Sequence, residues 1–319
     1  MLVVFVSTER RDPADEVKAV IVFAGPNGSG KSSITRSYLT NPENEFSGVY
    51  VNADDIAAGL TRQIPDVRER NIAAAQEAER QRLTLLETGE SFAFETVMST
   101  PEKVALLSQA RERGYEVTLV FVTTSDPEIN VSRVADRVAK GGHDVDPSAV
   151  HARYEAAMKL LPVAIEQADS VVVLDNSRDG ESAQIVAMKR DRGTLEVIKG
   201  PLTPQWAFDQ LERDYKARLE SLAALASALQ SEGHRAAPPV KLAEAADGLS
   251  YTGRMAAVTA LHLLQEEQEK RFLVHARALV QDRPFRSGLV QTVSYAYERG
   301  KIVPLEADRV KPGGSDRDR

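Results

Sequence analysis

Phosphate binding is the chemistry that the chain indicates most directly, through one octapeptide near its N-terminal end, Gly25-Pro26-Asn27-Gly28-Ser29-Gly30-Lys31-Ser32. It matches the P-loop pattern, in which two glycines separated by four residues are followed by Lys and a hydroxyl residue. The glycines let the backbone curl so that several N–H groups face the phosphates of a nucleotide. Lys31 then reaches the β- and γ-phosphate oxygens, and the Ser32 hydroxyl ligates Mg²⁺. ATP and Mg²⁺ are therefore the expected cofactors.

The flanking sequence supplies the two elements that such a loop needs. Ala19–Phe23 predicts a buried strand before the loop, and Ser33–Leu39 predicts the start of a helix after it. The first N–H groups and the dipole of that helix favour phosphate anions, so Ser33 joins the candidate nucleotide-binding residues. A glycine-rich turn without a ligand is the alternative, but such an octapeptide should arise by chance in only about one chain per hundred of this length.

Two carboxylates follow the second predicted strand, Val49–Val51, within the segment Asn52-Ala53-Asp54-Asp55. Ligands of open α/β sheets bind at the carboxyl ends of the strands, where an acceptor hydroxyl could be received. A carboxylate that accepts the proton of that hydroxyl contributes a rate factor of about 100 to 10,000. We favour Asp54 as this base. Asp55 is either a substrate-binding group or the N-cap of a helix that starts near Ile56.

Glu95 and Thr96 lie at the end of the third predicted strand. They share the carboxyl edge of the predicted sheet, where a polar substrate could be gripped. From the residues alone, a solvated strand end is an equal alternative. We therefore treat both as candidate substrate-binding residues.

A set of cations comes later in the chain. Arg133, Arg137 and Lys140 are four and three positions apart, so a helix presents them on one face. Gly141-Gly142 then breaks that helix, and Arg153 follows on a second predicted helix. Such a face beside a glycine hinge could close over ATP and neutralise charge on the transferred phosphoryl group. The alternative is an ordinary solvated face of charges.

A fifth apolar strand, Val171–Leu174, ends in Asp175, as does the magnesium-supporting strand of ATPase motors. Motors commonly place Glu after this acid, whereas Asn176-Ser177 follows here. A water-activating carboxylate is thus missing. We interpret the segment as a core strand with a loop near the nucleotide and keep a motor as the less favoured alternative.

The elements that must position these residues alternate between short apolar runs and helical stretches up to about Ile198. This pattern is typical of a parallel sheet with crossover helices. Three helix starts are marked by an N-cap residue and a following Pro, at Thr100-Pro101, Asp126-Pro127 and Asp146-Pro147. We expect a P-loop NTPase three-layer α/β fold with a mostly parallel five-stranded sheet, whose strands are Ala19–Phe23, Val49–Val51, Phe92–Phe94, Val117–Val122 and Val171–Leu174.

Beyond Gly200 the pattern changes to long helical stretches with almost no strand signal. We predict three helices, over Trp206–Gln230, Gly253–Gln281 and Phe285–Arg299. The expected organisation is a P-loop kinase domain over 1–200, a helical domain over 201–302 and a disordered tail over 303–319.

Composition places the chain among ordinary globular proteins, with 42% hydrophobic and 27% charged residues. Its net charge of -7 argues against nucleic acid as the main partner, because a phosphate backbone is bound by an excess of Lys and Arg. The absence of cysteine excludes disulfides and thiolate chemistry. No stretch approaches membrane-spanning length, and Met1–Ser7 lacks the features of a signal peptide, so we expect a cytoplasmic protein without a membrane partner.

Together, the P-loop, Asp54-Asp55, Phe94-Glu95-Thr96 and Gly141-Gly142-His143 resemble the zeta toxin family, with its branch of predicted ABC-type ATPases or kinases, over about Val17–Asn176. The resemblance implies a kinase that transfers the γ-phosphate of ATP to the 3′-hydroxyl of the sugar in UDP-N-acetylglucosamine. A related nucleotide sugar or another small molecule is the alternative acceptor. Such an enzyme poisons cell-wall synthesis, and the resemblance also implies an antitoxin protein as its partner.

The resemblance assigns roles to single residues as well. Asp54 matches the catalytic base of the family, and Glu95 matches an acid that holds the sugar nucleotide. Lys31 belongs to the ATP-binding loop and takes part in catalysis. Arg137 is similar to a catalytic lid arginine of the family, and the position of the second lid arginine stays open. The next arginine along the chain is Arg153, which we treat as a candidate substrate-binding residue.

Several alternatives stay open. A nucleotide-dependent ATPase, switch or binding module without a small-molecule acceptor is the competing function class. The region after Gly200 could be a dimer surface, an antitoxin docking site or a covalently attached inhibitor. His143, beside the two lid glycines, could touch phosphate or substrate or merely cap the loop.

Overall fold

A computed structural model describes residues 17–44, 46–141, 145–231, 240–267, 271–280 and 284–297 of the 319 residues. Gly142 and His143 of the predicted lid, and the tail predicted over 303–319, lie outside these ranges. None of the described helices combines the length and apolar character needed to cross a membrane.

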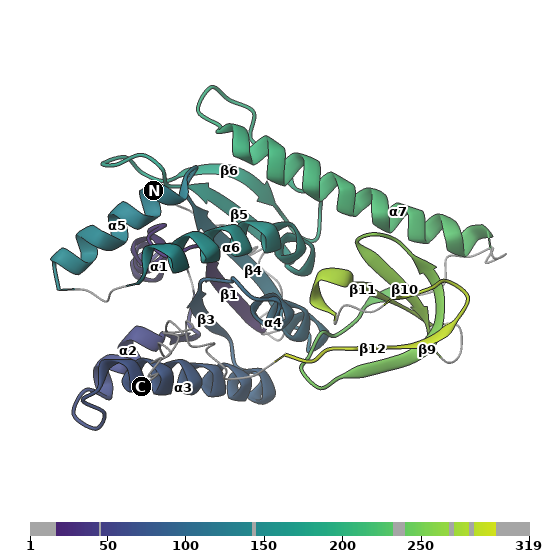
Figure 1. The fold of residues 1–319 in the computed structure, drawn as a ribbon, viewed down its shortest axis with the longest axis horizontal. Coiled ribbons are helices and arrows are strands. Elements are labelled where there is room, and N and C mark those ends of the chain that lie inside the picture. Colours follow the sequence, from purple (N-terminus) through teal and green to yellow (C-terminus); the bar gives the residue numbers. More distant parts are fainter. Residues whose placement is uncertain are drawn as a thin grey trace, which may run out of the picture.

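Within the described residues, the larger sheet has seven strands in the order β2-β3-β1-β4-β5-β6-β7 (Figure 1). The first five in this order are parallel and correspond to the five predicted strands. Two short antiparallel strands extend the sheet beyond β5. The bounds are β1 Ala19–Ala24, β2 Val49–Val51, β3 Phe92–Thr96, β4 Glu116–Thr123, β5 Ser170–Asp175, β6 Gln184–Lys189 and β7 Glu196–Val197. The predicted α/β fold with a mostly parallel sheet is confirmed, but the predicted number of five strands is wrong, because β6 and β7 extend the sheet to seven among the described residues.

Helices cover both faces of this sheet. Successive residues of a strand point to opposite faces, and in the buried strands the residues on both faces are apolar, so both faces must be covered. Val20 and Val22 of β1 pack in the core beneath α3, α4 and α6, whereas Ile21 and Phe23 pack on the other side with Tyr38 of α1. Prolines occupy the first turns of α4, α5 and α6, as predicted. The bounds are α1 Lys31–Thr40, α2 Ala53–Gly59, α3 Val67–Thr88, α4 Pro101–Glu112, α5 Pro127–Ala139 and α6 Pro147–Gln167.

The region after residue 200 is not helical throughout. A π-helical segment η1 (Ala207–Asp214) and α7 (Tyr215–Ser231) account for the first predicted helix. Among the described residues, a second sheet of five strands then follows, in the order β12-β9-β10-β11-β8. The bounds are β8 Val240–Leu242, β9 Ser250–Val258, β10 His262–Glu266, β11 Phe272–Ala276 and β12 Val290–Ser294, with a 3₁₀ turn η3 at Arg277–Leu279.

The helices predicted over Gly253–Gln281 and Phe285–Arg299 are therefore wrong. The two strands β10 and β11 are buried along nearly their whole length, so their short sequences, HLLQE and FLVHA, do not alternate between apolar and polar residues. Hydrophobic periodicity does not separate such a strand from a buried helix segment.

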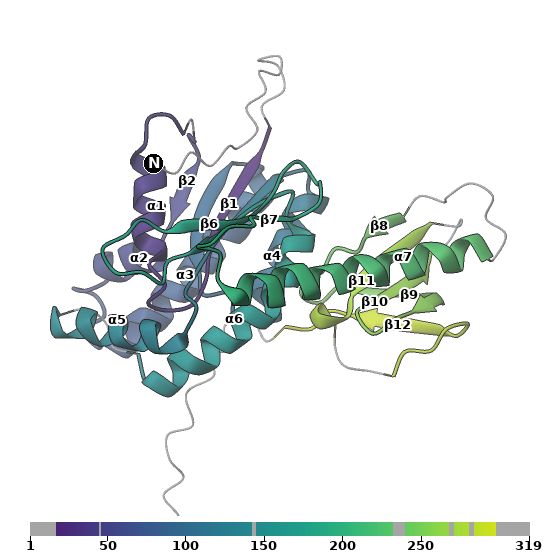
Figure 2. The ribbon, with the colours of Figure 1, turned by 90° about the horizontal axis from the view of Figure 1, so that it is seen from above.

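Both faces of the second sheet are covered. Leu225 and Leu229 of α7 pack with Leu264, Phe272 and Val274 on one face. The other face shares a hydrophobic core cluster with the large sheet and α4. Figures 1 and 2 show α7 extending from the large sheet along the small one. One hydrophobic cluster contains residues from before and after Gly200, so the two regions share a core. The domain boundary predicted near Gly200 therefore stays a prediction.

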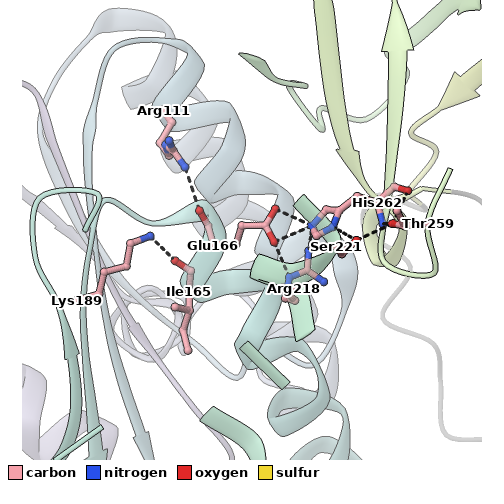
Figure 3. Close-up of polar contacts among 8 residues, drawn as sticks. All are labelled: Arg111, Ile165, Glu166, Lys189, Arg218, Ser221, Thr259 and His262. Atoms are coloured by element: carbon pink, nitrogen blue, oxygen red, sulfur yellow. Dashed lines mark hydrogen bonds and ion pairs between the residues drawn. The ribbon is translucent and has the colours of Figure 1, made fainter. Parts of the chain in front are cut away.

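A buried polar cluster joins the two parts (Figure 3). Arg218 Nε of α7 lies 2.5 Å from Glu166 Oε2 of α6, and His262 Nε2 of β10 lies 3.0 Å from the same oxygen. Burial by itself would raise the pKa of Glu166, but hydrogen bonding with His262 and the charge of Arg218 lower it below its usual value. The cluster thus holds α6, α7 and β10 together.

Candidate active site

The P-loop connects β1 to α1 and has a backbone that only glycine adopts easily. Gly25 and Gly28 have φ angles of 138° and 76°, in the region that side chains disfavour. A Cβ atom on Gly25 would lie 1.9 Å from the Val122 carbonyl oxygen, and one on Gly28 would lie 2.5 Å from the Asn130 carbonyl oxygen. The loop is thus packed closely against the ends of β4 and α5.

Three side chains from later elements brace this loop. Asn130 Nδ2 of α5 donates to the Asn27 carbonyl oxygen at 2.6 Å, and Asn176 Nδ2 donates to the Ser29 carbonyl oxygen at 2.8 Å. Arg153 Nη1 of α6 donates to Asn27 Oδ1 at 3.3 Å, which places this candidate arginine at the loop. The sequence reasoning missed both asparagines as site residues, and only Asn176, directly after the acid that ends β5, carried a signal. These contacts hold carbonyl oxygens of the loop in place, while the Gly25 and Ser29 N–H groups donate to the Thr96 and Pro26 carbonyl oxygens.

Lys31 begins α1 and folds back over the loop. Its Nζ donates to the Pro26 carbonyl oxygen at 2.7 Å. Burial lowers the pKa of Lys31 to about 8, while the charge of Glu95 raises it, that of Arg137 lowers it and that of Asp54 raises it. The structure therefore brings four of the predicted site residues within electrostatic reach of one another.

Two hydroxyl groups belong to the same loop and helix start. The buried Ser29 Oγ has no hydrogen-bond partner among the described residues. Buried polar atoms are normally hydrogen-bonded, so a bound ligand or water is the expected partner of this hydroxyl. Ser33, in the first turn of α1, is exposed, and its N–H donates to the Gly30 carbonyl oxygen. Together with the helix dipole, these groups fit the phosphates of a nucleotide.

A hydrogen-bonded chain of side chains lies beside the loop. Ser32 Oγ donates to Glu95 Oε2 at 2.8 Å, and the Tyr50 hydroxyl donates to Glu95 Oε1 at 2.8 Å. Asn52 Nδ2 in turn donates to the Tyr50 oxygen at 3.0 Å. The sequence reasoning did not single out Tyr50, because a tyrosine in a short strand gives no functional signal by itself.

Asp54 and Asp55 are exposed in the first turn of α2. The N-cap of this helix is Asn52, whose Oδ1 accepts from the Asp54 N–H at 2.8 Å. The alternative that Asp55 is the N-cap is therefore wrong, because the helix begins three residues before Ile56. Both carboxylates remain available to a ligand.

Thr96 connects β3 to the P-loop. Its carbonyl oxygen accepts from the Gly25 N–H at 3.2 Å, and its Oγ1 accepts from the Met98 N–H at 3.1 Å. The hydroxyl proton of Thr96 can still be donated elsewhere.

The cation face predicted on α5 is present. Its three cations, Arg133, Arg137 and Lys140, line an open cavity of about 560 Å³ together with Asp136 and Gly141. Arg133 is engaged within the protein, since its Nη2 lies 2.5 Å from Asp179 Oδ1 and its Nη1 donates to the Asn176 carbonyl oxygen at 2.7 Å. Arg137, whose charge acts on Lys31, remains the candidate for contact with phosphate.

Asp175, the acid of the motor alternative, is bound by donors within the protein. Trp206 Nε1 donates to its Oδ2 at 2.9 Å, and the Ser177 hydroxyl donates to the same oxygen at 3.0 Å. The residue of this segment that reaches the P-loop is its neighbour, Asn176.

The donor set at the loop also fits Mg²⁺. Hard cations prefer hydroxyl and carboxylate oxygens and share them with substrate phosphates. Ser32 Oγ and the Glu95 carboxylate supply such oxygens next to the loop. Within the described part of the chain, no group of three or more His, Cys, Asp and Glu side chains could hold a metal alone. A metal here would thus depend on the phosphates of a bound nucleotide.

Comparison with known proteins identifies the family. Residues 6–186, more than half of the chain, match the family model described as Zeta toxin. The chain belongs to the zeta toxin family. The zeta toxin match contains the P-loop and all the other predicted site residues. The predicted family is thereby confirmed, and with it a P-loop kinase-like domain. A second family model, described as the KfrB domain, matches residues 250–304, which include strands β9 to β12.

One curated protein and several solved structures are similar to parts of the chain. An uncharacterised protein of Haemophilus influenzae is 29% identical over 134 residues, which cover 42% of this chain and 91% of that protein. A chain of the AvrRxo1-ORF1:AvrRxo1-ORF2 complex aligns with a TM-score of 0.47 and 16% identity, over 57% of this chain and 61% of that chain. A chain from the PezAT toxin-antitoxin system of Streptococcus pneumoniae aligns with a TM-score of 0.40 and 18% identity, over 55% and 74%. The protein thus spans about three fifths of the AvrRxo1 chain.

Proposed function

We propose that the protein is an ATP-dependent kinase that transfers the γ-phosphate to a sugar hydroxyl of UDP-N-acetylglucosamine or a related nucleotide sugar. The observation that carries the proposal is the position of two carboxylates beside the P-loop: Asp54 is exposed in the first turn of α2, and Glu95 accepts a hydrogen bond from Ser32 at 2.8 Å. The charges of both, and that of Arg137, also act on Lys31. A loop that only binds a nucleotide needs the lysine, whereas transfer to a hydroxyl also needs a base and a cation for the moving charge.

Each residue has a defined part in this reaction. The loop N–H groups and Lys31 bind the phosphates of ATP, and Arg137 neutralises charge that builds up on the transferred group. Ser32 would hold Mg²⁺, which would supply further neutralisation of the phosphate charge when bound. The acceptor oxygen forms a bond to the γ-phosphorus while the bond to the β–γ bridging oxygen breaks. ADP leaves with that electron pair, and the acceptor proton passes to Asp54.

The acceptor would lie at the carboxyl edge of β2 and β3. Asp55 is exposed there, and the Thr96 hydroxyl can donate a hydrogen bond to a sugar oxygen. Arg153 adds a cation next to the loop, where it donates to Asn27, and is a further candidate for binding the substrate.

The family also supports a biological context. We infer that the protein acts as a toxin in the cytoplasm, where ATP and nucleotide sugars are available, and that an antitoxin protein restrains it. One solved relative belongs to a toxin-antitoxin system, and this description applies to that protein. Growth of cells that express the protein with and without a candidate antitoxin tests this context.

The proposed reaction is tested with paired variants. The purified protein is incubated with ATP, Mg²⁺ and a pool of nucleotide sugars, and mass spectrometry identifies any acceptor that gains one phosphoryl group. Asp54→Asn should lower the turnover by about 100-fold to 10,000-fold and leave ATP binding intact. Asp55→Asn is the matched control, because this neighbouring carboxylate is exposed on the same turn and should affect mainly the KM for the acceptor. Equal turnover of the Asp54 variant and the parent would reject Asp54 as the base.

A further inference from the structure

The hydrogen-bonded chain beside the P-loop links the predicted base to the predicted metal ligand. It runs from the Asp54 N–H at the start of α2, through Asn52 and Tyr50, to Glu95 and then to Ser32 in α1. Each of its contacts measures between 2.8 and 3.0 Å. Three separate elements, α2, β2 and β3, thus converge on one serine hydroxyl.

The donor and the acceptor of each hydrogen bond in this series, from Asp54 to Ser32, are determined. Asn52 Oδ1 accepts from a backbone N–H, so the amide Nδ2 must face Tyr50 and donate to its oxygen. The Tyr50 hydroxyl then has its proton free for Glu95 Oε1. A carboxylate accepts only, so the remaining contact, at Oε2, uses the proton of Ser32.

This direction has a consequence for Ser32. A serine hydroxyl has one proton and two lone pairs, and a cation is bound by the lone pairs. Because the proton of Ser32 points to Glu95, its lone pairs point elsewhere. The side chain is exposed, so they are accessible to a ligand at the loop. Glu95 therefore prepares the serine for a metal and adds negative charge beside it.

We propose that Glu95 belongs to the magnesium side of the site, where it orients the Ser32 hydroxyl and balances the charge of the metal, and that Tyr50 is the positioning residue for Glu95. The proposal rests on the proposed kinase function. It differs from the role that the family resemblance implies, in which Glu95 holds the sugar nucleotide.

Tyr50 is suited to this task. Burial, followed by the negative charge of Glu95, raises the pKa of Tyr50 well above its usual range, so its hydroxyl keeps the proton that it donates. The donated bond fixes one oxygen of Glu95 and leaves the other directed at Ser32. Loss of the Tyr50 hydroxyl alone should therefore loosen the carboxylate without removing its charge.

The test compares the magnesium dependence of nucleotide binding among variants. Binding of a fluorescent ATP analogue is measured in EDTA and across a Mg²⁺ titration, without any acceptor. Glu95→Gln should raise the half-saturating Mg²⁺ concentration at least about tenfold, and Tyr50→Phe should raise it about threefold to tenfold. Affinity in EDTA should stay within about twofold of the parent, since the loop is unchanged. Tyr38→Phe is the matched control, because this buried tyrosine packs against Phe23 in the neighbouring layer and should leave every value unchanged.

The outcomes separate this inference from the proposed function. An unchanged Mg²⁺ requirement in both variants, together with a raised KM for the acceptor in Glu95→Gln, overturns the magnesium role and favours the sugar-binding role. A parent protein that binds no nucleotide overturns the kinase proposal and this inference with it. Thermal melting checks the fold of each variant, and Tyr50→Phe, which removes a single oxygen atom, carries the test if Glu95→Gln fails to fold.

Discussion

Replacing Gly28 by alanine perturbs the P-loop at its tightest contact with α5. A Cβ atom at this position would lie 2.5 Å from the Asn130 carbonyl oxygen, whereas real Cβ atoms stay at about 3.0 Å or more. Either the loop or the helix must therefore move by about 0.5 Å, the difference between these distances. Such a movement disturbs the 2.6 Å hydrogen bond from Asn130 Nδ2 to the Asn27 carbonyl oxygen.

The magnitude of this effect follows from two contributions. The left-handed backbone of Gly28 costs alanine about 1–2 kcal/mol of folding free energy, and loss of the brace costs about 1 kcal/mol more. Gly114→Ala provides the matched control. Gly114 has a φ of 82°, and among the described residues no atom lies within 4 Å of its added Cβ. This control should lose only the backbone contribution.

Nucleotide affinity separates the two variants. We expect Gly28→Ala to weaken binding of a fluorescent ATP analogue at least about tenfold, which corresponds to about 1.4 kcal/mol, and Gly114→Ala to leave it within about twofold. Chemical denaturation measures the loss of stability in parallel. If Gly28→Ala binds nucleotide as tightly as the parent, the braced loop is not the phosphate site and the reasoning fails.

Three further predictions concern charge and the region after Gly200. Burial lowers the pKa of Lys31 to about 8, so the free protein loses this charge above pH 8 and must take up a proton to bind phosphate. Nucleotide affinity, measured by calorimetry, should thus fall about fivefold between pH 8 and 9, and Lys31→Arg should remove this dependence. Arg218→Met removes the arginine partner of the buried Glu166, leaves only its contact with His262, and should cost about 3–5 kcal/mol in chemical denaturation. The exposed Arg213→Met should cost less than about 1 kcal/mol, and equal effects would contradict a buried pair. Deletion of all residues after Gly200 should lower the melting temperature and the toxicity, and a stable, more toxic fragment would instead indicate an attached inhibitor.

The nucleotide-binding part of the fold was predictable because its signals are local. The P-loop octapeptide, the apolar run before it and the proline-marked helix starts each depend on a few adjacent residues. Four of the five parallel strands, β1, β3, β4 and β5, were recognisable because most of their residues are buried, which gives continuous runs rich in valine and phenylalanine.

The second sheet could not be predicted by the same reasoning. Its strands β10 and β11 are also buried on both faces, by α7 on one side and by the shared core on the other. A short buried segment without alternation, such as HLLQE or FLVHA, matches the pattern of a buried helix segment equally well. The sequence periodicity therefore gave the wrong element type where long-range packing decides.

The missed site residues illustrate the same limit. Asn130, Asn176 and Tyr50 lie 103, 147 and 45 positions away from the residues that they contact. Asparagine and tyrosine are common in helices, loops and strands, so only the folded chain reveals that these three surround the loop.

The predicted position of the helix after β2 failed for a local reason. Asn52 is in an extended conformation with φ of -127°, and its side chain caps the helix that begins at Ala53. Both Asn and Asp are good N-cap residues, so the sequence allowed either choice. Because Asn52 is the N-cap, the Asp55 carboxylate does not cap the helix and stays available to bind a substrate.

The destination of the γ-phosphoryl group tests the central claim most directly. The protein is incubated with ATP labelled in the γ-phosphate, Mg²⁺ and a pool of nucleotide sugars, and the label is separated into organic product and inorganic phosphate. The account predicts label in an organic acceptor, and none with Lys31→Ala. Label that appears only as inorganic phosphate, or equal transfer by Lys31→Ala, would contradict it.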